Sequence, residues 1–272
     1  MVSRYKDFSQ KLQTIMDTPQ SEAEMRLILE STGLSKQDFW LNKNIPDEKI
    51  TKINLLIEKR LKTRAPIQHL LGYGYFMGEK FIVNPDVLIP RPETELLVNA
   101  VSKLNAETIL DIGTGSGCIA IMLKKLTNKN ITACDISAKS LEIARKNAEN
   151  INVKVDFVES DLFSNIKKSF DIIVSNPPYI PYSEHHALDI EVKEHEPHLA
   201  LFASDESGVE FYEKIIKNSH KHLNQGGFLA FEIGIGQAKA ICELLKNNNF
   251  SKIQVLQDLA KIDRIIIAQK HF

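Results

Sequence analysis

This chain of 272 residues contains few cysteines and has almost no net charge. The three cysteines, Cys118, Cys134 and Cys242, are scattered among apolar neighbours, and no two of them form a CxxC pair. This spacing excludes a disulfide framework and predicts reduced, buried thiols. The 34 basic and 35 acidic residues leave a formal net charge of -1. Such a balance argues against a protein whose main task is to grip a nucleic-acid backbone.

The sequence also lacks long apolar runs. The first ten residues, MVSRYKDFSQ, are charged and contain no apolar core, so we expect no secretory signal. No uninterrupted apolar run approaches the length that spans a membrane. Hydrophobic residues make up 43% of the chain and charged residues 25%, as in ordinary globular proteins. We therefore expect a cytoplasmic protein without membrane contact.

Residues 1–75 are predicted to form a small helical domain. Ser21 and Glu24 make a capping-box pattern, which places the start of one helix at Ser21. Three- and four-residue steps between apolar side chains are typical of amphipathic helices in a bundle. The side chains with this spacing are Tyr5, Phe8, Leu12 and Ile15, and later Ile50, Ile53, Leu56 and Leu61.

The helical period is lost from Ile67 onward, and glycines, aromatics and prolines predict a hairpin and linker over residues 76–90. Strands and helices then alternate through residues 91–272, which predicts an α/β domain with a mostly parallel sheet covered on both faces. The last two strands are separated by a short turn and should pair antiparallel at one edge. The expected strands are 108–112, 131–135, 153–160, 170–174, 227–233, 252–258 and 263–269, and the expected helices 94–104, 117–126, 138–151, 208–223 and 236–249.

A glycine-rich loop, LDIGTGSGCIA, follows the first strand of this sheet and opens a helix. Its glycines let the backbone turn sharply and approach a ligand closely, at the sheet edge where α/β proteins bind cofactors. Cys118 stands where a dinucleotide fingerprint needs glycine, and no Lys-Ser/Thr pair of a P-loop follows. Asp111, at the start of the loop, would repel a pyrophosphate but attract a cationic group. The expected cofactor-binding residues of the loop are Gly113, Thr114, Gly115, Ser116 and Gly117.

Asp135 ends the second strand about 20 residues further on, where a carboxylate can accept hydrogen bonds from both ribose hydroxyls. Asp135 could instead cap the next helix, a role that Ser137 could fill equally well. A ribose and a cationic group without a diphosphate fit S-adenosyl-L-methionine. In the ESDLF loop after the third strand, Asp161 would accept from the adenine amino group and Leu162 would cover a ring face, although a polar strand exit would look similar.

The stretch SNPPYI, residues 175–180, ends the fourth strand. Asn and Pro also gather at strand exits for conformational reasons alone. However, DIGTGSG, ACDIS, ESDLF and SNPPYI in this order resemble class I methyltransferases that modify a planar amide or amino nitrogen. The further segments IQHLLGY, LIPRPETE, EPHLALF and FEIGIGQ resemble the HemK/PrmC family of release-factor glutamine methyltransferases over nearly the whole chain.

The resemblance implies a Rossmann-like methyltransferase domain over residues 91–272 and a substrate-recognition role for residues 1–75. It also implies that the Asn176 side-chain oxygen and the Pro177 carbonyl accept the two N–H groups of the substrate amide, with Asn176 beside the cofactor as well. Pro178 would help to fix the backbone, and Tyr179 would offer its ring to the amide. The implied substrate is the glutamine of the Gly-Gly-Gln motif in class-1 release factors, and no general base is obvious in the motif.

Three other functions stay open at this point. The same chemistry could act on a glutamine of a large-subunit ribosomal protein. An adenine-specific DNA methyltransferase can also carry NPPY, but it would need a target-recognition domain and a basic cleft. A binding module that had lost catalysis could keep the fold. We expect a protein substrate, no DNA and a monomer.

Other polar segments have weaker functional signals. Arg91 and Glu93 precede a helix and either favour its start or help to shape the site. The basic run Lys59–Arg64 is either a solvated helix face or a partner contact. We expect no metal site, because His185, His186, His195 and His198 lack the tight spacing of zinc ligands. We expect this histidine-containing loop to cover the substrate, with EPHLAL docking it back.

Overall fold

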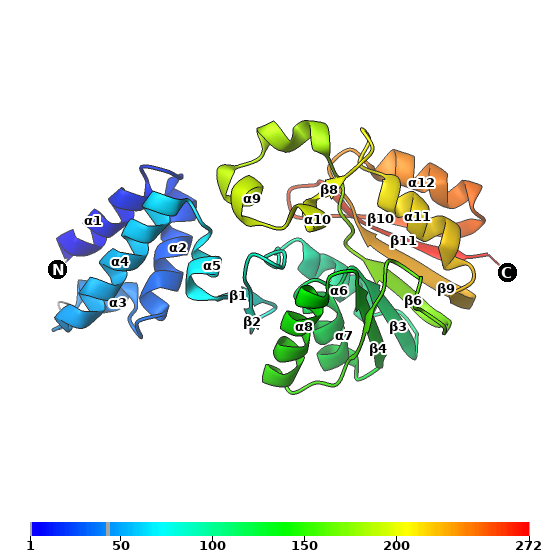
Figure 1. Cartoon of the computed structure of the whole chain (residues 1–272), viewed down its shortest axis with the longest axis horizontal. Helices are drawn as coiled ribbons and strands as arrows, with labels where there is room; N and C mark the ends of the chain where they lie inside the picture. The colour runs from blue at the N-terminus through cyan, green and yellow to red at the C-terminus, as the bar shows by residue number, and fades with distance from the viewer. Residues whose placement is uncertain (1, 42–43, 272) are drawn as a thin grey trace. The chain divides into compact units, whose positions relative to one another are not determined.

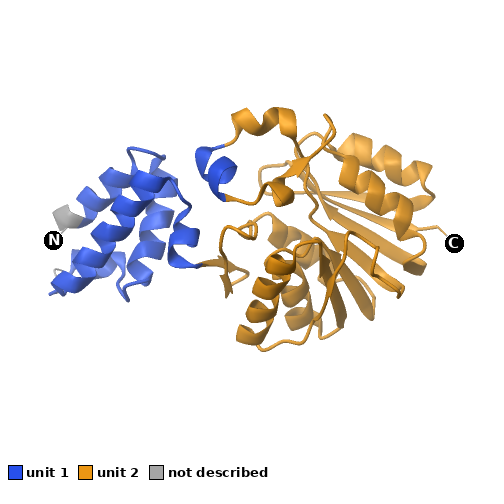
Figure 2. Cartoon of the chain, in the orientation of Figure 1, with its two compact units in different colours: residues 1–72, 189–195 blue, residues 73–188, 196–272 orange. Residues whose placement is uncertain are grey.

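The computed structural model describes residues 2–41 and 44–271, and these residues divide into two compact units (Figure 2). Unit 1 contains the described residues up to Gly72 together with 189–195. Unit 2 contains 73–188 and the described residues from 196 onward. No helix in the described part of the chain is both long and apolar enough to cross a membrane.

Unit 1 is a helical bundle, as the three- and four-residue spacing of its apolar side chains predicts. Its largest fully buried side chains include Phe39, Leu12 and Met25, which come from three different helices. The helices are α1 (Val2–Leu12), α2 (Thr18–Glu30), α3 (Lys36–Trp40), α4 (Asp47–Thr63), α5 (Ile67–Leu71) and α9 (Ile190–His195). The short helix α5 occupies the segment where the sequence pattern predicted that helical structure ends.

Helix α2 begins three residues before the predicted start at Ser21, so that prediction was wrong. Asp17 is the N-cap, and its side chain accepts a hydrogen bond of 2.8 Å from the backbone N–H of Gln20. Pro19 fits the first turn because its missing N–H needs no partner there. Ser21 is buried inside the helix, and Glu24 binds Arg60 rather than the helix start.

Unit 2 is built on a seven-stranded sheet in the order β10-β11-β9-β6-β3-β4-β5 (Figure 1). Strands β9, β6, β3, β4 and β5 run parallel, and β11 pairs antiparallel with both β9 and β10. The predicted antiparallel pair at one edge, β10 and β11, is confirmed. The strand that runs against all others is β11, which lies between the edge strand β10 and β9. The bounds are β3 (Thr108–Ile112), β4 (Asn130–Asp135), β5 (Asp156–Glu159), β6 (Phe170–Ser175), β9 (Leu223–Glu232), β10 (Phe250–Gln257) and β11 (Asp263–Lys270).

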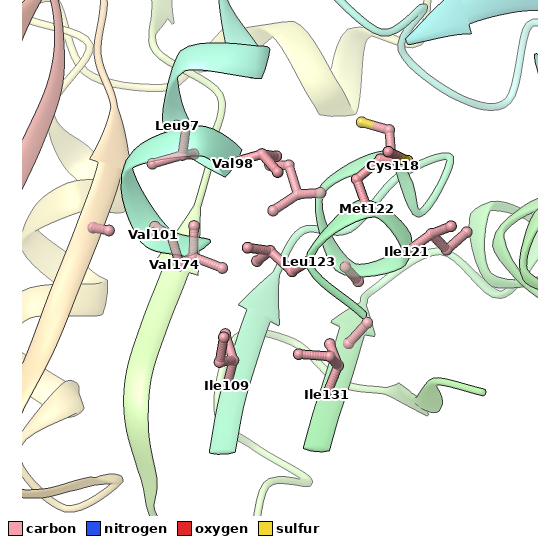
Figure 3. Close-up of a cluster of buried hydrophobic side chains, with 14 of the residues drawn as sticks. Leu97, Val98, Val101, Ile109, Cys118, Ile121, Met122, Leu123, Ile131 and Val174 are labelled. Carbon is pink, nitrogen blue, oxygen red and sulfur yellow. The ribbon is translucent and has the colours of Figure 1, made fainter. Parts of the chain in front are cut away.

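Helices cover both faces of the sheet, as the buried strands require. On one face Leu97, Val101 and Leu123 pack against Ile109 and Val174 (Figure 3). Helices α6 (Thr94–Ser102), α7 (Cys118–Thr127) and α8 (Ala138–Asn150) supply this layer, and α11 (Glu210–Ser219) and α12 (Ala238–Asn247) supply the other. The remaining elements of unit 2 are the hairpin β1 (Tyr73–Phe76) and β2 (Glu79–Ile82), the pair β7 (Ile180–Pro181) and β8 (Phe202–Ala203), a 3₁₀ helix (Tyr182–Ala187) and α10 (His198–Leu201).

Candidate active site

Unit 2 contains a cavity of about 460 Å³ at the carboxyl ends of β3, β4 and β6. This edge of a parallel α/β sheet is where such folds bind their ligands, and the volume lies within the usual range for small-molecule pockets. Ten of the predicted site residues line the cavity: Gly113, Thr114, Gly115, Ser116, Asp135, Asp161, Leu162, Asn176, Pro177 and Pro178. Gly117 and Tyr179 do not belong to the lining formed by the described residues.

The glycine loop presents bare backbone to this cavity. Gly113 and Gly115 both have positive φ values, of 70° and 55°, and a Cβ added to either would come within 4 Å of no described atom. Gly117 differs, because an added Cβ would lie 2.8 Å from Ile121 Cδ1 and 3.1 Å from Ala144 Cβ. The first two glycines therefore leave room on the cavity side, and the third allows α7 and α8 to pack closely.

Asp135 joins the second strand to the glycine loop. Its Oδ2 accepts a hydrogen bond of 2.8 Å from the Gly115 N–H, and its Oδ1 accepts one of 2.9 Å from the Ser137 N–H. Ser137 is the N-cap of α8, where its hydroxyl accepts from the Ser140 N–H. Burial raises the pKa of Asp135, and the backbone hydrogen bonds oppose this effect. A carboxylate can accept about four hydrogen bonds, so Asp135 keeps acceptor capacity on the cavity side.

Asp111 lies behind the loop instead of facing the cavity. It is fully buried, its Oδ2 accepts a hydrogen bond of 2.6 Å from the Thr114 hydroxyl, and it is absent from the described cavity lining. Burial raises the pKa of Asp111 to about 7, against the opposing effect of Thr114. The structure thus differs from the expectation that Asp111 attracts a cationic ligand group, since the side chain supports the loop from inside.

The third strand contributes Asp161 and Leu162 from a tight turn. Leu162 has a φ of 48°, and its carbonyl accepts from the Ser160 hydroxyl at 2.9 Å. The Asp161 N–H donates to the Ser164 hydroxyl at 3.1 Å, while the Asp161 side chain is exposed at the cavity. These bonds hold both residues at the cavity without using the Asp161 carboxylate.

The NPPY segment leaves β6 directly beside β3. The Ser175 hydroxyl donates to the Ile112 carbonyl at 2.7 Å, which ties the ends of the two strands together. Asn176 is partly buried, and its Nδ2 donates to the Thr94 hydroxyl at 3.4 Å. The amide nitrogen of Asn176 is therefore engaged with α6, while Asn176, Pro177 and Pro178 all line the cavity.

Tyr179 turns from the cavity lining toward the protein interior. Its ring packs against the buried cluster beneath α11 and α12, and burial raises its pKa. Its carbonyl accepts a hydrogen bond of 3.0 Å from Gln237 Nε2, and Gln237 Oε1 accepts from the Gly234 N–H at 2.9 Å. Gln237 thus holds the exit of the NPPY segment. Sequence reasoning gave it no role, and the only signal was its place at the end of FEIGIGQ.

The segment before α6 also reaches the cavity. The sequence left open whether Arg91 and Glu93 favour the helix start or help to shape the site, and it predicted only a linker for the residues before Arg91. The lining includes Pro85, Asp86, Val87, Leu88, Pro90 and Arg91. Arg91 forms an ion pair with Glu196, which is 4% exposed. Burial raises the pKa of Glu196, and the Arg91 guanidinium lowers it. The irregular segment is held to α8 by the Ser140 hydroxyl, which donates to the Asp86 carbonyl at 3.1 Å.

Residues 189–195 of the histidine-containing loop and the basic run of α4 meet within unit 1. Arg60 is 3% exposed and pairs with Glu24 and Glu191, both at 3.0 Å. Arg64 pairs with Glu191 at 2.7 Å, and the His195 ring bonds to the Thr63 carbonyl at 2.8 Å. These pairs explain why residues 189–195 belong to unit 1, although the sequence placed them in the second domain. Among the described residues, no group of three or more acidic, Cys or His side chains could hold a metal ion.

Two family models match the chain. The Methyltransferase small domain matches residues 92–194, and the PrmC N-terminal domain matches residues 5–72. A release factor glutamine methyltransferase from Flavobacterium psychrophilum is 40% identical over 98% of this chain and 98% of its own. This chain belongs to the release factor glutamine methyltransferase family. The resemblance carried by the sequence motifs is thereby confirmed.

Other relatives agree with this family. A release factor glutamine methyltransferase from Bacteroides thetaiotaomicron is 39% identical over 96% of this chain and 97% of its own. A methyltransferase structure from Pyrococcus furiosus aligns with a TM-score of 0.58 at 24% identity, covering 72% of this chain and 91% of that one, which supports the fold. The class I methyltransferase fold predicted from the sequence is confirmed, and the protein is a methyltransferase with S-adenosyl-L-methionine as methyl donor.

Proposed function

We propose that this release factor glutamine methyltransferase family member methylates the side-chain amide nitrogen of the glutamine in the Gly-Gly-Gln motif of class-1 release factors. The observation that carries the proposal is the placement of Asn176. Its Nδ2 is bound to Thr94, and the residue lines the same cavity as the glycine loop and Asp135. The Asn176 side-chain oxygen, which could accept a hydrogen bond from a substrate amide, therefore lies in the same cavity as the residues expected to bind the methyl donor.

The cavity lining includes groups that suit the methyl donor. Gly113 and Gly115 leave open backbone at the wall, and Asp135 has acceptor capacity for a ribose. Asp161 and Leu162 would contact the adenine. When bound, S-adenosyl-L-methionine supplies an electrophilic methyl group.

Asn176 and Pro177 would orient the substrate. A glutamine amide nitrogen is a poor nucleophile because its lone pair is delocalised into the carbonyl. The Asn176 Oδ1 and the Pro177 carbonyl would accept the two N–H groups in the amide plane, which aims the face of the nitrogen at the methyl group. Positive charge develops on the nitrogen during transfer, so these acceptors bind the transition state more tightly than the ground state. Pro177 and Pro178 restrict the backbone, so the carbonyl is held in place before the substrate arrives.

Unit 1 is proposed to recognise the release factor, as the expected role of residues 1–75 suggests. We further propose that the enzyme works in the cytoplasm as a monomer and does not act on DNA. The nearly neutral composition supports a protein substrate over DNA.

A methylation assay with tritiated methyl donor tests the proposed substrate. Purified release factor, its Gln→Ala variant, a large-subunit ribosomal protein and double-stranded DNA would be offered separately under the same conditions. Label should enter the release factor and should be absent from the Gln→Ala variant. Label on the ribosomal protein or on DNA without label on the release factor would contradict the proposal.

A further inference from the structure

A buried glutamate lies next to Asn176 on the neighbouring strand. Strands β6 and β9 are parallel, and Ser175 is paired with Phe231, so the following residues, Asn176 and Glu232, lie beside each other. Glu232 is 4% exposed and is not part of the described cavity lining. The Tyr212 hydroxyl donates to the Glu232 carbonyl at 2.9 Å, which fixes the end of β9. The residue is therefore close to the proposed site without facing the ligand.

The Glu232 carboxyl takes part in a small hydrogen-bonded group. Asn176 Nδ2 donates to the Thr94 hydroxyl at 3.4 Å, and hydrogen bonding from Thr94 and Asn176 opposes the rise that burial causes in the pKa of Glu232. The Oε2 atom of Glu232 has no hydrogen-bond partner in the described ranges. A buried carboxyl with an unused oxygen costs stability, so its retention at this position calls for a function.

We propose that Glu232 is a positioning residue for methyl transfer: with Thr94, its carboxylate fixes the Asn176 amide so that Nδ2 points inward and Oδ1 faces the substrate. The inference rests on the proposed role of Asn176. An amide side chain has one donor end and one acceptor end of nearly equal shape, so packing alone fixes its orientation poorly. A carboxylate only accepts hydrogen bonds, so it selects the donor end of Asn176. Hydrogen bonds in such a chain also polarise one another, which strengthens Oδ1 as an acceptor.

The orientation should depend on the charge of Glu232. Burial raises the pKa of Glu232 to about 7, with Glu93 raising it further and Thr94, Arg264 and Asn176 lowering it. A protonated carboxyl becomes a donor, so it would no longer exclude the inverted amide. Methyl transfer should therefore decrease as the pH falls through about 7.

The other groups around Glu232 do not provide the same titration. Burial raises the pKa of Tyr179, holds that of Tyr212 well above its ordinary value and raises that of Cys118 to about 12, so all three stay neutral there. Arg264 is paired with Asp258 at 2.9 Å.

Kinetics of Glu232→Gln provide the first test, with the exposed Glu243 changed to Gln as the matched control. The substituted glutamine keeps the shape of the side chain but can donate, so it permits both orientations of Asn176. We expect kcat at pH 8 to fall by about 10- to 100-fold, the range found when groups that orient a ligand are removed. The decrease of kcat on the acid side should become smaller, leaving only the part that comes from Asp111, whose pKa is also about 7, and affinity for S-adenosylhomocysteine should be unchanged. Retention of the wild-type acid limb by Glu232→Gln would overturn the proposal.

Thr94→Val supplies an independent variant of similar shape. It should lower kcat to a similar degree as Glu232→Gln, and the double variant should be no slower than the slower single variant, because both act through Asn176. Effects that simply multiply in the double variant would show that Glu232 does not act through Thr94 and Asn176, and would overturn the proposal.

The ligand-free enzyme allows a test that does not depend on the substrate. With ¹⁵N-labelled asparagine, the side-chain signal of Asn176 is identified by its loss in Asn176→Ala. Its chemical shift should titrate with a midpoint near pH 7 in the wild type and in Glu243→Gln, and should not titrate in Glu232→Gln. An equal titration in Glu232→Gln, or none in the wild type, would contradict the inference. If the titration is found but no release factor is methylated, the coupling stands and the proposed function fails.

Discussion

Alanine at Gly117 should mainly destabilise the fold, whereas alanine at Gly115 should mainly weaken cofactor binding. Both glycines have positive φ values, of 84° and 55°. A left-handed backbone costs a non-glycine residue roughly 1–2 kcal/mol, and this cost applies to both variants. At Gly117 the added Cβ also meets Ile121 Cδ1 at 2.8 Å and the Ala144 Cβ and Cα at 3.1 and 3.3 Å. Ile121 can adjust its side chain, but Ala144 can move only with the backbone of α8.

Overpacking of this kind costs about 1–3 kcal/mol. We therefore expect Gly117→Ala to lower the free energy of unfolding of unit 2 by roughly 2–5 kcal/mol, and Gly115→Ala by only about 1–2 kcal/mol. Affinity for S-adenosylhomocysteine should show the reverse order at a temperature where both variants are folded. The Gly115 methyl group would project into the cavity, whereas the Gly117 methyl group would point toward α7 and α8.

Calorimetric unfolding and titration calorimetry measure the two effects. Tryptophan fluorescence would not serve, because the single tryptophan, Trp40, lies in unit 1 and would report on that unit. Equal thermal stability of the two variants would refute the packing argument. Wild-type affinity in Gly115→Ala would refute the argument that the donor approaches the loop backbone.

Three further predictions follow from the site. Asn176→Ala should abolish methyl transfer while leaving S-adenosylhomocysteine affinity largely intact, and turnover within about tenfold of wild type would contradict the role given to Asn176. Asp135→Ala should weaken S-adenosylhomocysteine binding by roughly 10- to 100-fold, because hydrogen bonds to a charged group contribute about 1.5–3 kcal/mol. Unchanged affinity in titration calorimetry would show that Asp135 only supports the loop. Glu232→Gln should be more stable than wild type at pH 8. Because burial raises the pKa of Glu232 to about 7, its contribution to the free energy of unfolding is present at low pH and is lost as the pH rises through about 7. The ionised carboxylate at pH 8 therefore lowers the free energy of unfolding by on the order of 3 kcal/mol. The difference in melting temperature should shrink toward pH 5, and a constant difference would contradict the raised pKa.

Local sequence patterns predicted the strands and the approximate placement of the site, for reasons visible in single elements. Ile109 and Leu110 on β3 are both buried, as expected for a strand covered on two faces. Because parallel strands end at the same edge, the loops after β3, β4 and β6 had to meet there. The sequence left open whether Asp135 or Ser137 caps the next helix, and Ser137 is the N-cap.

Features that depend on distant contacts were not predicted. Glu232 looked like part of a buried strand, and only the pairing of β9 with β6 places it beside Asn176. Arg60 lay in a basic run that resembled a solvated face, but Glu24 and Glu191 make it an internal ion-pair centre. The cavity wall before α6 has no periodicity, so its first part, residues 85–87, could not be told from an ordinary linker, whereas LIPRPETE was noticed only by its resemblance.

The most direct test of the central claim is the location of the methyl group on the product. Release factor incubated with the enzyme and S-adenosyl-L-methionine would be digested and sequenced by tandem mass spectrometry, with the Asn176→Ala enzyme as control. We expect one added methyl group on the side chain of the Gly-Gly-Gln glutamine, and none with the variant. A methyl group on any other residue, or an unmodified glutamine after incubation with active enzyme, would contradict it.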